Sequence, residues 1–147
     1  MKSAEAFAAQ EAARTGHGVI TTTHANSCET TYNRMVTLCK TKYDINDKTL
    51  YNLVTEAFPI VMFTKRLEDS TRKIMEITEC EILPDGERKI HTLFRFNITD
   101  NSISKGKIAI KGEFERVNPI SASLQKRLRE NGIPLNALEK LIGGGGE

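Results

Sequence analysis

Two histidines bracket a short run of β-branched residues near the start of the sequence. His17 precedes the Val-Ile-Thr-Thr-Thr run of residues 19–23, and His24 follows it. Residues 18–23 therefore predict a short buried strand of a parallel sheet. Because ligands of open α/β sheets bind at the carboxyl ends of the strands, the imidazole of His24 could donate a hydrogen bond to a phosphate there. Such a contact strengthens as negative charge builds during phosphoryl transfer, which makes His24 a candidate catalytic residue.

Other interpretations of the same residues remain open. Backbone groups could satisfy the His24 ring without any ligand. His17, His24 and Cys28 could be imagined as metal ligands, but no pair has zinc-finger spacing and the sequence contains no CxxC. We therefore expect no metal site, and a metal-dependent hydrolase that uses the two histidines stays a separate hypothesis.

The three cysteines indicate a protein from a reducing compartment. Cys28, Cys39 and Cys80 are odd in number and irregular in spacing, which favours buried thiols over a disulfide framework. The longest apolar run, residues 58–63, is far shorter than the ~20 residues of a membrane-spanning helix. The first residues also lack the pattern of a secretion signal. We expect a folded cytoplasmic protein.

Helices alternate with apolar strands in the first half of the chain. A helix is expected over residues 4–15, a second after Asn26, where Glu29 completes a capping box, and a third from residue 47. In the second and third helices, apolar residues fall at i, i+3, i+4 and i+7, starting from Tyr32 and Leu50 respectively. The third helix leads into an apolar strand over residues 59–64. Repetition of a helix before a buried strand is typical of an α/β fold.

The second half predicts antiparallel strands followed by short helices. Residues 72–82 and 88–98 flank a Pro-Asp-Gly turn at 84–86 and form a predicted hairpin, with His91 on its polar face. A polar loop over 99–106, a third strand over 107–117 and two short helices follow. The expected divisions are residues 1–70, 71–117, 118–142 and a flexible tail, 143–147.

Several ordered stretches resemble the motor ATPases of bacterial type II and type IV secretion and pilus assembly. Residues 15–27, TGHGVITTTHANS, resemble the histidine box of these ATPases, and residues 1–6, MKSAEA, resemble the stretch that follows their Walker B strand. The stretches AFPIVMF, TRKIMEITE and TLFRF, at 57–63, 71–79 and 92–96, are similar to the strands of the tight-adherence (Flp-type) pilus branch. The resemblance covers residues 1–98 and extends, more weakly, to residue 120.

The resemblance implies the C-terminal part of a RecA-like P-loop domain, with parallel strands near 18–23 and 59–64. In the parent protein, His24 would sense the γ-phosphate, and His17, Thr23 and His24 would form part of a site for ATP and Mg²⁺. The parent would be a ring, expected to be a hexamer, that works with inner-membrane platform proteins at the cytoplasmic face of the membrane.

The departures from the family pattern limit what this chain can do alone. It contains no GxxxxGK[ST] loop, because Gly106-Lys107 is followed by Ile108. The family's catalytic glutamate would lie just before Met1. We therefore expect the chain alone neither to bind ATP tightly nor to hydrolyse it. The missing part of the sheet would leave an open edge, which predicts a dimer or higher oligomer.

Charge identifies no further partner. The net charge is +2 and the basic residues are scattered, so no specific nucleic-acid binding is expected. Arg34, Lys65 and Arg66 are basic positions best explained as surface charges. An alternative function is a non-catalytic interaction module that docks on a secretion-system membrane protein or a partner ATPase through the hairpin and tail.

Overall fold

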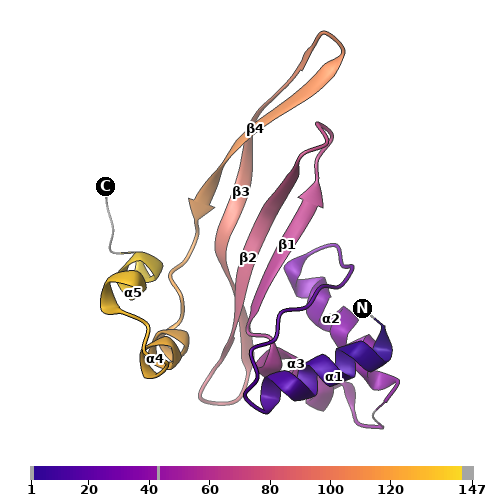
Figure 1. Ribbon diagram of the computed structural model, residues 1–147, viewed down its shortest axis with the longest axis vertical. Helices are drawn as coiled ribbons and strands as arrows, with labels where there is room; N and C mark the ends of the chain where they lie inside the picture. Colours follow the sequence, from indigo (N-terminus) through magenta and orange to yellow (C-terminus); the bar gives the residue numbers. More distant parts are fainter. Residues whose placement is uncertain (1, 43, 144–147) are drawn as a thin grey trace.

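The computed structural model describes residues 2–42 and 44–143, which form an antiparallel sheet with helices on both faces. The strands pair in the order β1-β2-β3-β4, and each pair is antiparallel (Figure 1). Their bounds are β1 Ile60–Arg66, β2 Arg72–Ile82, β3 Arg88–Ser104 and β4 Lys107–Arg116. The helices of these residues are α1 Ser3–Arg14, α2 Cys28–Lys40, α3 Asp47–Ala57, α4 Ala122–Glu130 and α5 Leu135–Ile142. Except for Gly143, the predicted tail lies outside the described residues.

The expected parallel, RecA-like strands are wrong for the described residues. Residues 18–23 form no strand, and Ile20 is 96% exposed instead of buried. The predicted strand at 59–64 exists as β1, but it pairs antiparallel with β2. A strand needs a neighbouring backbone to bond its N–H and C=O groups, and no described strand runs beside residues 18–23. The β-branched run therefore remains unpaired.

Helices α1, α2 and α3 cover one face of the sheet. Their core includes Tyr32, Met35, Leu50 and Val54, which pack with Cys80 of β2. Tyr32 also donates a hydrogen bond of 2.9 Å from its hydroxyl to the Phe58 carbonyl, at the entry to β1. The apolar spacing predicted for α2 and α3 is thus the spacing of this core.

The start of α2 differs from the expected capping box by one residue. Ser27, not Asn26, is the N-cap, and its hydroxyl accepts a hydrogen bond from the Thr30 backbone N–H at 3.1 Å. The Thr30 hydroxyl in turn accepts a bond of 3.0 Å from the Ser27 N–H, so threonine takes the place predicted for Glu29. Both residues belong to one helical turn, and serine is as good a cap as asparagine.

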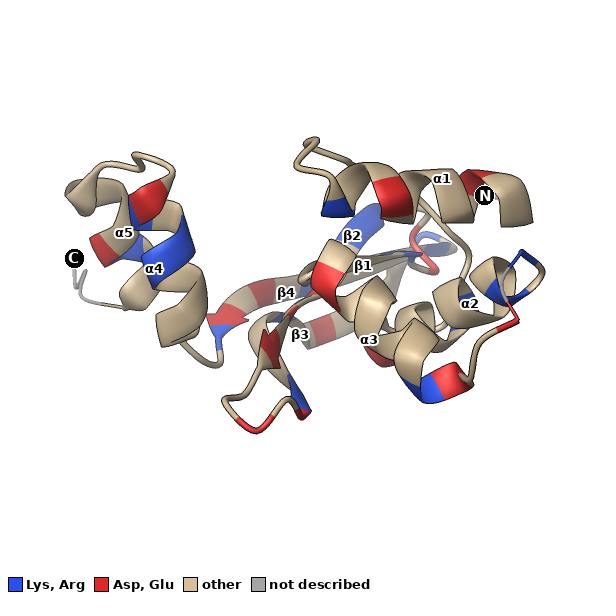
Figure 2. Ribbon diagram, turned by 90° about the horizontal axis from the view of Figure 1, so that it is seen from below, with Lys and Arg blue, Asp and Glu red and all other residues tan. Residues whose placement is uncertain are grey.

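Helices α4 and α5 lie on the opposite face (Figure 2). Leu93, Ile120 and Leu138 form the small core beneath them. Glu79 of β2 is 2% exposed, and it accepts hydrogen bonds from the Ser121 hydroxyl and, at 2.8 Å, from the Ser121 backbone N–H. At the other end of this layer, Arg116 donates to the carbonyls of Leu141 at 2.8 Å and Lys140 at 2.5 Å. These polar contacts attach the short helices to the sheet.

Strands β3 and β4 continue far beyond the rest of the sheet. The polar loop predicted over 99–106 is wrong, because β3 runs through Ser104 after a register shift between Ile98 and Asp100. Asn, Asp and Ser are uncommon in strands, but pairing with β4 overrides that preference here. The strands are joined by a two-residue turn, Lys105-Gly106, in which both φ angles are positive (50° and 72°).

Glycine is required where this ribbon leaves the sheet. A Cβ on Gly112 would stand 2.5 Å from Cζ of Phe96, closer than real Cβ contacts come. The absence of that atom lets the rings of Phe96 and Phe114 meet edge to face, with centroids 5.2 Å apart.

We predict that the cysteines are unreactive in the folded protein. Cys28, Cys39 and Cys80 are free and buried, and burial raises the pKa of each thiol, so little thiolate exists near neutral pH. A thiol-specific disulfide reagent should label no cysteine rapidly at pH 7.5 and three per chain in guanidinium chloride. Labelling of one native thiol at the rate of free cysteine would contradict this packing.

We also predict that Glu79 holds α4 to the sheet. Glu79→Ala removes the acceptor of both Ser121 bonds and should lower the free energy of unfolding by about 1.5–3 kcal/mol, measured by urea denaturation. Glu113→Ala, on an exposed position of β4, is the matched control and should change it by less than about 0.5 kcal/mol. Equal effects of the two substitutions would refute this role.

Candidate phosphate-binding cavity

A cavity of about 1060 Å³ separates the unpaired segment 19–26 from β1. Its opposite wall is formed by residues 57–64, and its floor by side chains of α2 and α3. β1 is an edge strand, so the backbone groups along its outer side face away from β2. The cavity thus lies between the unpaired segment and the outer edge of β1, where β1 has no described neighbouring strand.

The structure brings together only part of the predicted site. His24 and Thr23 both line the cavity, with His24 exposed and Thr23 half-buried. Within the described part of the chain, the His24 ring makes no hydrogen bond or ion pair. It is therefore free to meet a ligand, and the backbone-satisfied alternative finds no support.

His17 lies apart from these residues. It is exposed, does not line the cavity, and has its Nδ1 3.3 Å from the Thr15 hydroxyl. Six residues, 18–23, separate the two histidines in the sequence, and the described structure has no contact between their side chains. His17 could join the predicted nucleotide site only if this segment or its surroundings were arranged differently.

Arg34 is the residue that sequence reasoning set aside and the structure brings to the cavity. It is exposed on α2, lines the same cavity as His24, and has no ion-pair partner among residues 2–42 and 44–143. The available signal was helical spacing, since Thr31, Arg34 and Met35 stand at i, i+3 and i+4 on one face. Spacing alone would not have separated Arg34 from other surface cations, because it does not show what that face covers.

The charges around the cavity favour an anion. Its described lining contains an arginine and a histidine but no aspartate or glutamate. Anions are attracted to a concave site that carries positive charge without nearby carboxylates. The remaining walls are threonine hydroxyls and apolar side chains such as Tyr32, Phe58 and Phe63.

A metal centre on the two histidines and Cys28 lacks a structural basis. The described residues contain no group of three His, Cys, Asp or Glu side chains that could hold a metal ion. The Cys28 thiol instead lies 3.6 Å from the Val61 carbonyl and 3.7 Å from the Glu76 carbonyl, and its burial raises its pKa. A protonated, inward-facing thiol is a poor metal ligand.

Comparison with known proteins gives the family. Among the described residues, no helix is long and apolar enough to cross a membrane. No curated protein matches the sequence. A family model described as type II/IV secretion system protein matches residues 2–132. Because the match spans most of the 147 residues, the chain belongs to the family of type II/IV secretion system proteins.

Proposed function

We propose that this chain is the C-terminal part of a motor ATPase that powers secretion, pilus assembly or conjugation. In the complete protein, His24 would contact the terminal phosphate of ATP. The observation that carries the proposal is the unpaired ring of His24 in a cavity whose described lining includes Arg34 and no acidic side chain. Membership of the secretion family supports it.

The chemistry assigned to this chain is electrostatic. Phosphoryl transfer is catalysed chiefly by positioning and by stabilising charge on the phosphate oxygens. His24 would donate a hydrogen bond to an oxygen that gains negative charge, and Arg34 would add positive charge in the same cavity. Thr23 would orient the backbone beside His24. The phosphate loop, the glutamate that orients water and the groups that hold Mg²⁺ would come from another part of the parent protein.

The geometry of the cavity supports the idea of a missing part. Residues 19–23 are β-branched and unpaired, and β1 has an open edge, so the two backbones flank a space where further strands could pair. Pairing there would turn residues 18–23 into the buried strand that the sequence predicts. It would also hold His24 at a strand end.

Partners and location follow from the same proposal. The parent would assemble into a ring, expected to be a hexamer, on inner-membrane platform proteins at the cytoplasmic face of the membrane. A second candidate function is a non-catalytic module that accepts a partner's strand at the open edge of β1.

The motor and the module are distinguished by the DNA upstream of the Met1 codon. An in-frame glutamate and GxxxxGK[ST] loop would support the motor, whereas an in-frame stop codon would support the module.

We predict that His24 matters for catalysis in the longer protein. With the upstream ATPase segment present, His24→Ala should lower kcat about 10²-fold, as removal of one preorganised donor does, with a smaller change in KM. The measurement is steady-state phosphate release. The 147-residue chain alone should show no activity above background.

The matched control for this prediction is His91→Gln. His91 lies on β3, where its Nε2 is 2.6 Å from a Glu81 carboxylate oxygen, and it does not line the cavity. This variant should keep kcat within about twofold. Equal loss of activity in the two histidine variants would contradict a catalytic role of His24. ATP hydrolysis by the 147-residue chain alone, abolished by His24→Ala, would contradict the need for the upstream segment.

We further predict that the isolated chain self-associates through the open edge of β1. Edge strands with apolar side chains template pairing with another chain, and Met62 on β1 is 58% exposed. Light scattering should give a dimer or larger species, and Met62→Lys should shift it toward the monomer. A monomer at working concentration, before any substitution, would rule this out.

A further inference from the structure

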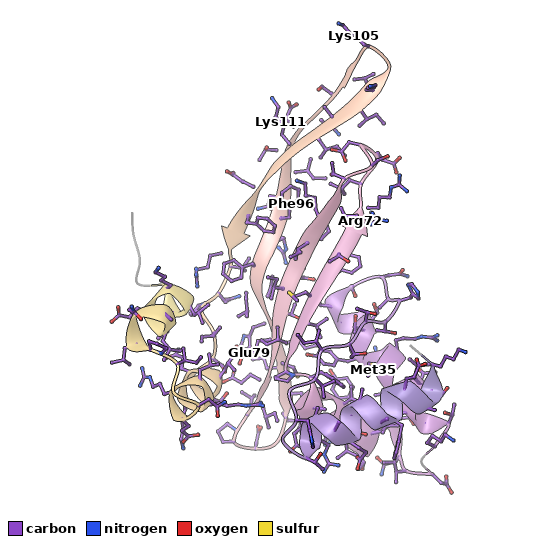
Figure 3. All side chains as sticks on the ribbon, in the orientation of Figure 1. Met35, Arg72, Glu79, Phe96, Lys105 and Lys111 are labelled. Carbon is purple, nitrogen blue, oxygen red and sulfur yellow. The ribbon has the colours of Figure 1, made fainter. Side chains whose placement is uncertain are left out.

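The two-stranded ribbon formed by β3 and β4 ends in a projecting tip, which contacts the turn between β1 and β2 only at its base, where the Ile110 backbone N–H bonds to the Asp69 carboxylate. We call residues 100–111 the ribbon tip; its strand pairs run from Asp100 with Lys111 to Ser104 with Lys107. The ribbon projects beyond β1 and β2, away from all of the helices, and Lys105 marks its far end (Figures 1 and 3). The described side chains between residues 101 and 109 are exposed, so both faces of this far end are uncovered, whereas Ile110 at the base is half-buried.

One face of the ribbon tip is apolar. Residues directly opposite each other in an antiparallel pair share a face. Ile103 pairs with Ile108, next to the turn, and Ile110 lies on the same face opposite Asn101. Ile103 is 76% exposed and Ile108 is 41% exposed. Two paired isoleucines held in water at the end of a projecting ribbon indicate a surface that something else covers.

The rest of the ribbon tip is basic. Lys105 occupies the turn, while Lys107 and Lys111 lie on the face opposite the isoleucines. The tip contains one acidic residue, Asp100 at its base, with a carboxylate oxygen 4.0 Å from Nζ of Lys111. Three lysines against one aspartate leave the tip positive, and the excess is greatest at its far end.

We propose that the ribbon tip inserts into the headgroup region of an anionic lipid bilayer. Ile103 and Ile108 would turn toward the acyl chains, and the three lysines would meet lipid phosphates. A bilayer interface surrounds a narrow ribbon on every side, so it accommodates the apolar face and the basic face at the same time. The depth is limited, because the outer edges of the ribbon carry unpaired backbone groups that must stay near water.

Charge argues against a second copy as the occupant. Two tips packed through their isoleucines would cover the apolar face but leave Lys105 and Lys107 outside the contact, where no described acidic side chain forms an ion pair with them. An anionic lipid surface can contact the isoleucines and the lysines of one tip at the same time. The proposal does not depend on the cavity or on ATP binding. It assigns to the ribbon tip a direct contact with lipid, in addition to any contact of the protein with a platform protein.

The expected affinity of one tip is modest. A lysine near an anionic bilayer contributes about fivefold to partitioning, and partial burial of an isoleucine contributes on the order of tenfold. A single tip would therefore bind reversibly. Several tips on one face of an oligomer would bind far more tightly through their raised effective concentration.

Vesicle sedimentation with the whole 147-residue chain tests the proposal. The chain should bind vesicles of mixed phosphatidylglycerol and phosphatidylcholine, lose that binding as salt rises, and ignore pure phosphatidylcholine. Ile103→Ser combined with Ile108→Ser should weaken binding at least about tenfold. Lys105→Gln and Lys107→Gln should weaken it about fivefold each. Circular dichroism checks that each variant keeps its fold.

Matched controls use the same residue types elsewhere. Lys89→Gln and Ile133→Ser change an exposed lysine and an exposed isoleucine outside the tip, and both should leave vesicle binding unchanged. Because the sequence contains no tryptophan, Ile103→Trp gives a single reporter whose emission should shift to the blue with anionic vesicles. Lys89→Trp should not shift.

Three results would overturn the proposal. The first is the absence of vesicle binding, and the second is binding that the tip variants and the control variants weaken equally. The third is loss of self-association, rather than of vesicle binding, in the Ile103→Ser and Ile108→Ser double variant. That result would assign the apolar face to a second copy of the chain.

Discussion

The central position of β2 is the constraint on which the rest of the fold depends. β2 pairs with β1 on one side and β3 on the other, and successive residues point to opposite faces. Cys80 therefore enters the core of α1–α3, while its neighbour Glu79 receives two hydrogen bonds from Ser121 beneath α4. A slip of one residue in this register would bury a carboxylate in an apolar core and remove the anchor of the C-terminal helices.

The candidate site, in contrast to β2, lies beside backbone that pairs with no described strand. Residues 18–23 have the composition of a buried strand, yet Ile20 is almost fully exposed. The cavity beside them is lined by the open edge of β1 and by the side chains of His24 and Arg34. Because residues 18–23 pair with no described strand, no sheet fixes the positions of the two histidines. His24 lines the cavity with a free ring, and His17 lies outside the cavity.

Sequence patterns predicted the local elements better than their pairing. The spacing of Tyr32, Met35 and Cys39 correctly gave the buried side of α2, and the Pro84-Asp85-Gly86 turn correctly joined β2 to β3. The parallel sheet failed because pairing depends on which backbones are present, and no local pattern carries that information. The loop predicted over 99–106 failed because polar residues form a strand when β4 supplies the hydrogen bonds.

The candidate site was predictable to a similar extent. His24 was found from its place after a β-branched run, and it does line a cavity. Arg34 could not be selected, because its significance comes from what lies across from it and not from its own neighbours in sequence. The distance between His17 and the cavity was equally hidden, since it depends on whether the segment between the histidines is held in a sheet.

Strand β4 also links two distant ends of the molecule. Its first residues form part of the projecting hairpin, and its last residue, Arg116, donates hydrogen bonds to the Lys140 and Leu141 carbonyls of α5. Ten residues of strand make a stiff rod of roughly 30 Å. One continuous strand therefore connects the projecting hairpin to the side chain that holds the C-terminal helix.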